Sequence, residues 1–212
     1  MILLAMVLLL GTAAAAPLRA QEARGARGID AARRGGIVIA CRHAMTLRFN
    51  EDEATLKYDD PTTQRRLSRR GEWQAESMGK AFRALEIGVG EVIASPMQRA
   101  RRHAEVAFGK PALDSSWHTR GSNYRGPKRE RRLEQLSRPT ERNRAIVSHV
   151  ETMRSVLPAI GDDFQEGDCI VVRPLGNGRH EAIEVVPWRA WLRAAGLRDT
   201  VPDGERSSTR VR

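Results

Sequence analysis

Short apolar runs alternate with segments of helical period along most of the chain. Strands are predicted at residues 36–41, 91–94, 145–148, 168–173 and 181–186. Helices are predicted to begin at Ser68 and Ser95, with further helices near residues 129–136, 151–160 and 188–195. This alternation predicts an α/β fold whose open, mostly parallel sheet has helices on both faces and ends in a C-terminal β-hairpin and a closing helix.

Cap and turn residues mark several of the expected boundaries. Ser68 is a suitable N-cap for a helix whose apolar residues recur at spacings of three and four. Ser95 and Pro96 place a capping residue before a proline at the first helical position, which predicts a helix from there to Phe108. Residues 176–178, with the sequence Gly-Asn-Gly, predict the turn between the last two strands.

The two ends of the chain differ from its middle. Residues 1–20 combine the apolar run MILLAMVLLL with a stretch of small residues. This predicts a cleaved signal peptide and a periplasmic or secreted protein, with no stable membrane insertion after processing. An uncleaved anchor or a buried N-terminal helix is the alternative. Residues 21–35 are expected to form a leader, residues 36–198 the folded domain and residues 199–212 a polar tail.

Basic residues outnumber acidic residues in the expected domain. The 36 Lys and Arg residues against 26 Asp and Glu residues give a formal net charge of +10, and removal of residues 1–20 leaves +9. This excess of positive charge favours anionic partners. Aromatic residues make up only 5% of the chain and do not alternate with Lys or Arg, so no nucleic-acid partner is predicted.

Two cysteines lie in predicted strands, Cys41 at the end of the run IVIAC and Cys169 in the run DCIVV. We expect both to be buried and free, because Cys often behaves as a small buried hydrophobic residue. A disulfide is the alternative in an oxidising compartment. Neither a Cys-x-x-Cys nor a His-x-x-x-His spacing occurs, so the sequence predicts no metal site, and no cofactor is expected.

Basic and imidazole side chains follow the ends of three predicted strands. Arg42 and His43 follow the first, Ser95 leads from the second into the helix that carries Arg99, and His149 follows the third. Ligands of open α/β sheets bind beyond the carboxyl ends of the parallel strands. These side chains are therefore expected to converge on one site.

Such a group of side chains suits a phosphate. A phosphoryl group in transfer carries negative charge on its equatorial oxygens, which planar guanidinium groups contact through paired hydrogen bonds. Arg42 and Arg99 are the expected ligands. A neutral imidazole can act as a nucleophile and form a covalent intermediate, so from the residues alone either His43 or His149 is a candidate nucleophile.

Four sequence elements occur in a fixed order. They are Arg42-His43-Ala44 after an apolar strand, Leu67-Ser68-Arg69-Arg70-Gly71-Glu72-Trp73-Gln74-Ala75, Ala94-Ser95-Pro96-Met97-Gln98-Arg99-Ala100-Arg101, and Val147-Ser148-His149. Together they resemble the signatures of the histidine phosphatase superfamily, the phosphoglycerate mutase-like enzymes, from about residue 36 to residue 195. The apolar N-terminus and the segment Glu166-Gly167-Asp168 are similar to those of small secreted or periplasmic members.

This resemblance assigns roles to the four converging residues. It implies that His43 becomes phosphorylated and that Arg42, Arg99 and His149 bind the phosphate, without a metal ion. It further implies a phosphatase that hydrolyses phosphate monoesters or phosphohistidine. The expected partner is therefore a phosphorylated small molecule or a phosphoprotein.

Three features depart from the superfamily's pattern. His103 stands where Thr is common and is expected either at the rim of the pocket or on the helix surface. Val150 replaces the frequent Gly after the second histidine. The acid that protonates the leaving group is not at a motif position. Glu130, Glu134 and Glu151 are the candidates, and each is also compatible with a solvated surface carboxylate.

Two alternatives to an enzyme stay open. One is a non-catalytic secreted anion-binding module with a degenerate phosphatase pocket. The other is a protein whose basic region, defined as residues 120–144, binds an acidic polymer or membrane surface. A solvated basic face is the simpler interpretation of that region.

Overall fold

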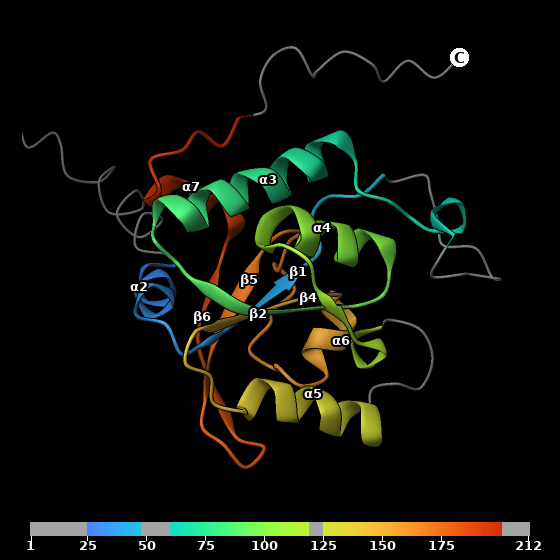
Figure 1. Cartoon of the computed structure of the whole chain (residues 1–212), viewed down its shortest axis with the longest axis vertical. Coiled ribbons are helices and arrows are strands. Elements are labelled where there is room, and N and C mark those ends of the chain that lie inside the picture. Colours follow the sequence, from blue (N-terminus) through green and yellow to red (C-terminus); the bar gives the residue numbers. More distant parts are fainter. Residues whose placement is uncertain (1–24, 48–59, 119–124, 201–212) are drawn as a thin grey trace, which may run out of the picture.

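The computed structural model describes residues 25–47, 60–118 and 125–200, so the predicted signal peptide and most of the predicted tail lie outside the described residues. Within these ranges one sheet has the order β3-β2-β4-β1-β5-β6 (Figure 1). Its strands are β1 (Val38–Arg42), β2 (Val89–Ala94), β3 (Ala112–Leu113), β4 (Asn143–Ser148), β5 (Cys169–Pro174) and β6 (His180–Val186). The first four strands run parallel, whereas β5 is antiparallel to β1 and to β6. The predicted mostly parallel sheet with a C-terminal hairpin is confirmed.

Helices cover both faces of the sheet (Figure 1). One face carries α2 (Ala26–Arg34), α3 (Arg69–Ala84), α4 (Gln98–Phe108) and α7 (Trp188–Ala194), and the other carries α5 (Pro127–Ser137) and α6 (Val150–Arg154). In β1, Ile39 and Cys41 pack on the first side, and Val38 and Ala40 pack on the second. A strand covered on both faces reads as a continuous apolar run, as the sequence of β1 does. In the described part of the chain, no helix has the length and apolar character needed to cross a bilayer.

The predicted helix start at Ser68 is confirmed, whereas the start at Ser95 is wrong. Ser68 is the N-cap of α3, and its hydroxyl accepts a hydrogen bond from a backbone N–H of the first turn. The next helix, α4, begins only at Gln98. Ser95 stays beside the sheet, because its N–H donates to the carbonyl of Val147 at 3.0 Å and its hydroxyl contacts His149.

The leader predicted at residues 21–35 is in part a helix of the domain. α2 buries Ile29 in the same core as α7. At the N-terminus of α2, the N–H groups of Gly25 and Gly28 donate to the Glu184 carboxylate of β6 at 3.1 and 2.9 Å. A carboxylate is favourable at this end of a helix dipole. The contact fixes α2 against β6, so the domain begins before β1.

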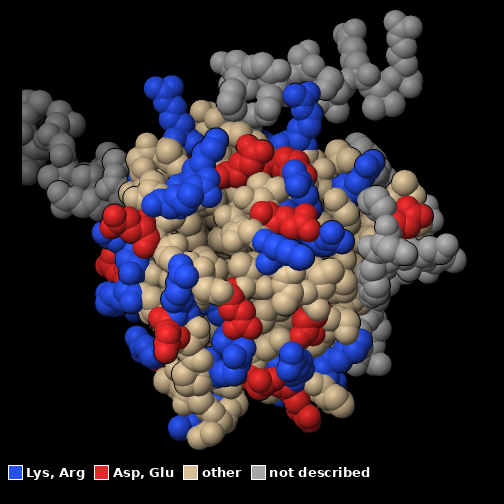
Figure 2. Space-filling model, viewed as in Figure 1, with Lys and Arg blue, Asp and Glu red and all other residues tan. Residues whose placement is uncertain are grey.

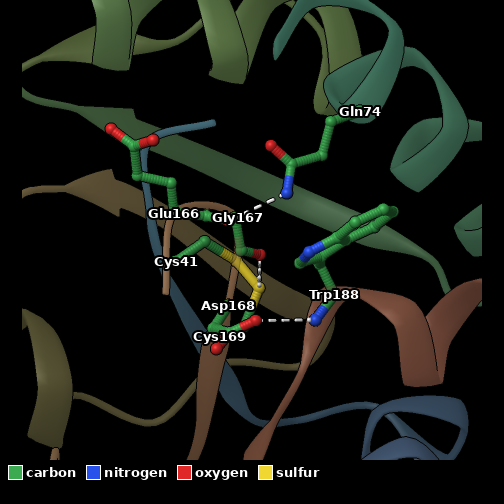
Figure 3. The surroundings of a disulfide bond; sticks show 7 residues. All are labelled: Cys41, Gln74, Glu166, Gly167, Asp168, Cys169 and Trp188. Carbon is green, nitrogen blue, oxygen red and sulfur yellow. Dashed lines mark hydrogen bonds between the residues drawn. A yellow bond between two sulfur atoms is a disulfide. The ribbon is translucent and has the colours of Figure 1, made fainter. Parts of the chain in front are cut away.

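A buried disulfide joins β1 to β5, so the expectation of free cysteines is wrong (Figure 3). Cys41 and Cys169 stand directly opposite each other in the antiparallel ladder, with their Cα atoms 4.0 Å apart. Both side chains are fully buried. The two cysteines are 128 positions apart in the sequence, and only the register of β1 on β5 makes them neighbours.

Candidate active site

The carboxyl ends of β1, β2 and β4 meet at one edge of the sheet, where they border a cavity of about 180 Å³. The residues that line the cavity are Arg42, His43, Arg65, Arg99, His149, Val150 and Glu151. The structure thus brings together the four residues that the sequence analysis assigned to a phosphate site. It adds one arginine that the analysis did not single out.

His43 lies just beyond β1 in a fixed orientation. Its backbone N–H donates to the carbonyl of Ser148 at 2.9 Å, which continues the pairing of β1 with β4. Its ring Nδ1 lies 2.9 Å from the carbonyl oxygen of Ala44. A carbonyl only accepts hydrogen bonds, so Nδ1 carries the proton of the neutral imidazole and Nε2 carries the lone pair.

The segment before β5 holds Arg42 at two points. The backbone N–H of Arg42 donates to the carbonyl of Asp168 at 2.9 Å, and its Nη1 donates to the carbonyl of Phe164 at 3.0 Å. Asp168 is itself fixed, since its carboxylate accepts from the N–H groups of Gln165 and Trp188, both at 2.9 Å. Burial raises the pKa of Asp168. The guanidinium is therefore positioned before an anion binds, which favours binding and catalysis.

His149 and Arg99 complete the site. The ring centroid of His149 is 5.3 Å from that of His43, and the rings meet edge to face at 61°. Its Nε2 lies 2.9 Å from the hydroxyl oxygen of Ser95, and its buried Nδ1 has no hydrogen-bond partner among the described residues. Arg99 comes from the first turn of α4 and is only 3% exposed. Its charge is therefore little screened by solvent.

Both imidazoles at the cavity are neutral at neutral pH. Burial lowers the pKa of His43 well below its usual value of 6.5, and the positive charges of Arg99 and two further arginines lower it more. Burial and then Arg99 likewise lower the pKa of His149. A neutral His43 keeps the lone pair that a nucleophile needs.

Sequence reasoning missed Arg65, which also lines the cavity. It precedes Leu67, which pairs with Thr46 in an isolated antiparallel bridge beyond the end of β1. This bridge holds the segment that carries Arg65 next to the segment that follows His43. Residues 65–70 contain four arginines, so composition alone does not indicate which of them faces the anion.

Only one of the three candidate acids reaches the cavity. Glu151 lines it, with a solvent-exposed side chain. Glu130 and Glu134 lie on α5 and line a different cavity, next to the turn between β5 and β6. Glu134 pairs there with Arg131 at 3.1 Å. The structure therefore does not bring Glu130 or Glu134 to His43, because α5 packs on the face of the sheet away from α3 and α4.

The sequence analysis expected His103 at the rim of the pocket or on the helix surface. The structure places it at neither position. It is fully buried on the inner face of α4 and stacks on Phe108, with ring centroids 6.1 Å apart. Burial lowers the pKa of His103 to about 4, and the nearby backbone of Arg42 raises it by a smaller amount. The side chain is therefore a neutral component of the packing behind Arg42.

Charged side chains of the protein itself pair with several arginines of the basic region. Arg131 contacts Asp114 at 3.2 Å, and Arg138 contacts Glu91 at 3.0 Å. The buried Arg144 also pairs with Glu91, at 2.6 Å. Figure 2 shows acidic and basic side chains interspersed over the face in view. These pairs favour a solvated, internally compensated surface over a polyanion-binding one.

Comparison with known proteins agrees with this geometry. Residues 38–119 match the family model of the histidine phosphatase superfamily, branch 1. This part of the chain is therefore similar to that superfamily. The matched range contains the first three sequence elements, and the fold brings the fourth, with His149, to the same cavity. The family match and the geometry together support phosphatase activity in general.

Two solved structures have a fold similar to that of this chain. A SixA protein from Agrobacterium tumefaciens superposes with a TM-score of 0.51 and 17% identity, over 72% of this chain and 99% of that one. The protein histidine phosphatase SixA complexed with tungstate gives a TM-score of 0.53 and 13% identity, over 72% of this chain and 97% of that one. No curated protein sequence matches the chain. At these identities the likeness establishes a phosphoglycerate mutase-like fold.

Proposed function

We propose that the protein hydrolyses phosphate monoesters or phosphohistidine through a phosphohistidine intermediate on His43, without a metal ion. One observation carries the proposal. A buried, neutral imidazole with its Nδ1 engaged by a carbonyl borders a cavity lined by Arg42, Arg65 and Arg99. Guanidinium groups bind and neutralise the equatorial oxygens of a transferring phosphoryl group.

The reaction has two displacements at phosphorus. In the first, the lone pair of His43 Nε2 forms a bond to phosphorus, the bond from phosphorus to the leaving oxygen or nitrogen breaks, and the leaving atom takes up a proton. In the second, water attacks phosphorus, the bond to Nε2 breaks, and the released phosphate leaves a neutral imidazole. His149 and the arginines hold the phosphoryl oxygens in both steps.

The lining of the cavity favours substrates with good leaving groups, because it holds no buried carboxylate among the described residues. Glu151 is the only Asp or Glu among the described residues that line it, and its side chain is exposed. A positioned acid contributes about 10²–10⁴-fold, chiefly for poor leaving groups. The leaving group is a phenolate in one case and an imidazole in the other, and their conjugate acids have pKa values of about 10 and about 6.5. Both groups leave with less protonation than an alkoxide needs. We therefore place aryl phosphates and phosphohistidine ahead of alkyl phosphates as substrates.

Turnover of p-nitrophenyl phosphate in EDTA between pH 4 and pH 8 tests the proposal. We expect turnover by the unaltered protein and a phosphoenzyme that is labile in acid and stable in alkali. His43→Asn should abolish both, whereas His180→Asn, a matched change on β6, should leave both intact. Saturable phosphate binding without turnover would instead identify a non-catalytic anion-binding module. Persistent turnover in His43→Asn would refute the mechanism.

We also propose that the protein works in an oxidising compartment, as a periplasmic or secreted enzyme. The buried disulfide between Cys41 and Cys169 supports this, because disulfides persist mainly in oxidising compartments. The apolar N-terminal segment supports it from the sequence. Mass spectrometry of the protein recovered from the periplasm or medium of the expressing cell, with the N-terminus determined, tests both export and cleavage. A full-length product retained in the cytoplasm would contradict it.

A further inference from the structure

A carboxylate lies beside the imidazole of His43. Glu166 Oε1 is 3.9 Å from Nδ1 of His43. Nδ1 is the ring nitrogen that bears the proton, so the carboxylate faces the N–H edge of the imidazole and not the attacking Nε2. Glu166 is not among the residues that line the phosphate cavity.

One hydrogen bond holds the carboxylate of Glu166, and others hold its backbone. The hydroxyl of Thr46 donates to Glu166 Oε1 at 3.0 Å. The amide of Gln74 on α3 donates to the carbonyl of Glu166 at 2.8 Å and accepts from the N–H of Met45 at 3.0 Å. The N–H of Gly167 donates to the carbonyl of His43 at 3.0 Å. The backbone of Glu166 is thus tied to the residues that flank the nucleophile.

Gly167 makes this arrangement possible. Its φ of +89° lies in the left-handed region, which glycine adopts most readily. A Cβ atom at this position would stand 2.1 Å from the amide nitrogen of Gln74. Figure 3 shows how closely Gln74 approaches this segment. Only glycine allows Gln74 to clamp the segment, so the position of the Glu166 backbone is defined by the fold.

The charge of the imidazole changes during the reaction proposed above. In the resting protein, burial and the arginines keep His43 neutral, and no full ion pair with Glu166 exists. When Nε2 bonds to phosphorus while Nδ1 keeps its proton, the ring gains a positive charge. The arginines oppose this charge, whereas a carboxylate at 3.9 Å favours it.

We propose that Glu166 is a positioning residue that acts through His43: it orients the imidazole and stabilises the positive charge that the ring acquires on phosphorylation. The proposal rests on the proposed function. The role parallels that of a carboxylate that holds a catalytic imidazole and stabilises its imidazolium form. Because Glu166 is separated from the phosphoryl oxygens, its effect falls on the rate of phosphorylation and not on the binding of the anion.

The test is a rapid-quench measurement of phosphoenzyme formation from p-nitrophenyl phosphate. Glu166→Gln keeps the size of the side chain and removes its charge. We expect the phosphorylation rate constant to fall about tenfold, the order expected for an ion pair at 3.9 Å with one partner about a quarter exposed. The inhibition constant for inorganic phosphate should stay within about twofold of the original or decrease, since a negative charge near the cavity has been removed.

Further variants separate the charge from the structure. Glu166→Asp retains the charge and should recover part of the rate, and Thr46→Val should give about a threefold loss, because one contact to the carboxylate is removed. Glu181→Gln, the same change at an exposed residue paired with Arg173 on the hairpin, is the matched control and should leave the rate unchanged.

The possible failures are distinguishable. An unchanged phosphorylation rate in Glu166→Gln, with normal phosphoenzyme in the unaltered protein, would overturn the role of Glu166 alone. A parallel loss of phosphate binding, or an equal loss in Glu166→Asp, would also overturn it, because either would indicate a merely structural role. Absence of phosphoenzyme from the unaltered protein would refute the proposed function itself.

Discussion

Reduction of the disulfide should lower the stability of the domain by several kcal/mol. Cys41 and Cys169 close a loop that spans 128 positions. In the chain-entropy model, a loop of that length corresponds to about 5 kcal/mol at 25 °C. Measured values often fall below the model, so we expect the free energy of unfolding to decrease by about 3–5 kcal/mol. For a domain of this size, such a loss lowers the melting temperature by roughly 10 °C.

Guanidinium unfolding of the protein with and without dithiothreitol measures this effect. The double variant Cys41→Ala with Cys169→Ala controls for other actions of the reductant and should not respond to it. Thiol titration of the denatured, unreduced protein should find no reactive thiol, since the chain has two cysteines and both are bonded. Two free thiols, or a stability change below about 1 kcal/mol on reduction, would refute the reasoning.

Three further predictions concern the cavity and a buried histidine outside it. Ser95→Ala should lower kcat/KM about tenfold in steady-state assays, because the hydroxyl at 2.9 Å orients His149; an unchanged value would show that the ring is held by packing alone. Arg65→Gln should weaken inhibition by inorganic phosphate about tenfold, because one cation at the cavity is lost. An unaltered inhibition constant would place Arg65 outside the anion site. His103 has a pKa of about 4 in the folded protein against about 6.5 when unfolded, so the unfolded state binds more protons between these values. The stability that His103 contributes should therefore be fully present above pH 6.5 and fall as the pH drops towards 4. Urea unfolding across this range checks it, and His103→Gln should make the profile less steep without flattening it, since the pKa values of His43 and His149 are also lowered.

The sequence predicted the parallel part of the sheet well because its strands are short apolar runs that end at polar residues. The start of α3 was also predictable, since the capping side chain of Ser68 acts on its own helix. α2 was missed because its helix contains several arginines, and its burial depends on β6, far away in the sequence. Ser95 misled the prediction because its hydroxyl accepts from the N–H of Met97, ahead of α4, and also contacts His149, a tertiary role that the local sequence does not show.

The candidate site was predictable wherever a residue directly follows a parallel strand. His43 and His149 directly follow β1 and β4, Arg42 is the last residue of β1, and topology alone brings all three to one edge of the sheet. Arg65 and Glu166 do not follow a parallel strand in this way. Arg65 reaches the cavity through a loop bridge, and Glu166 reaches His43 through an antiparallel strand that pairs with β1 from the other side. Neither relation leaves a local pattern in the sequence.

The two sides of β1 therefore carry different parts of the site. On one side, β4 pairs with β1 and β2 pairs with β4, all in parallel, and residues that line the cavity follow the ends of these strands. On the other side, the antiparallel β5 begins where β1 ends, so the disulfide and the contacts of Asp168 and Gly167 all fall beside Arg42 and His43. A parallel strand would have placed its carboxyl end there and added another ligand for the anion. The antiparallel strand instead places the segment that leads into it beside Arg42 and His43, where the carbonyl of Asp168 and the N–H of Gly167 hold the backbone of these two residues.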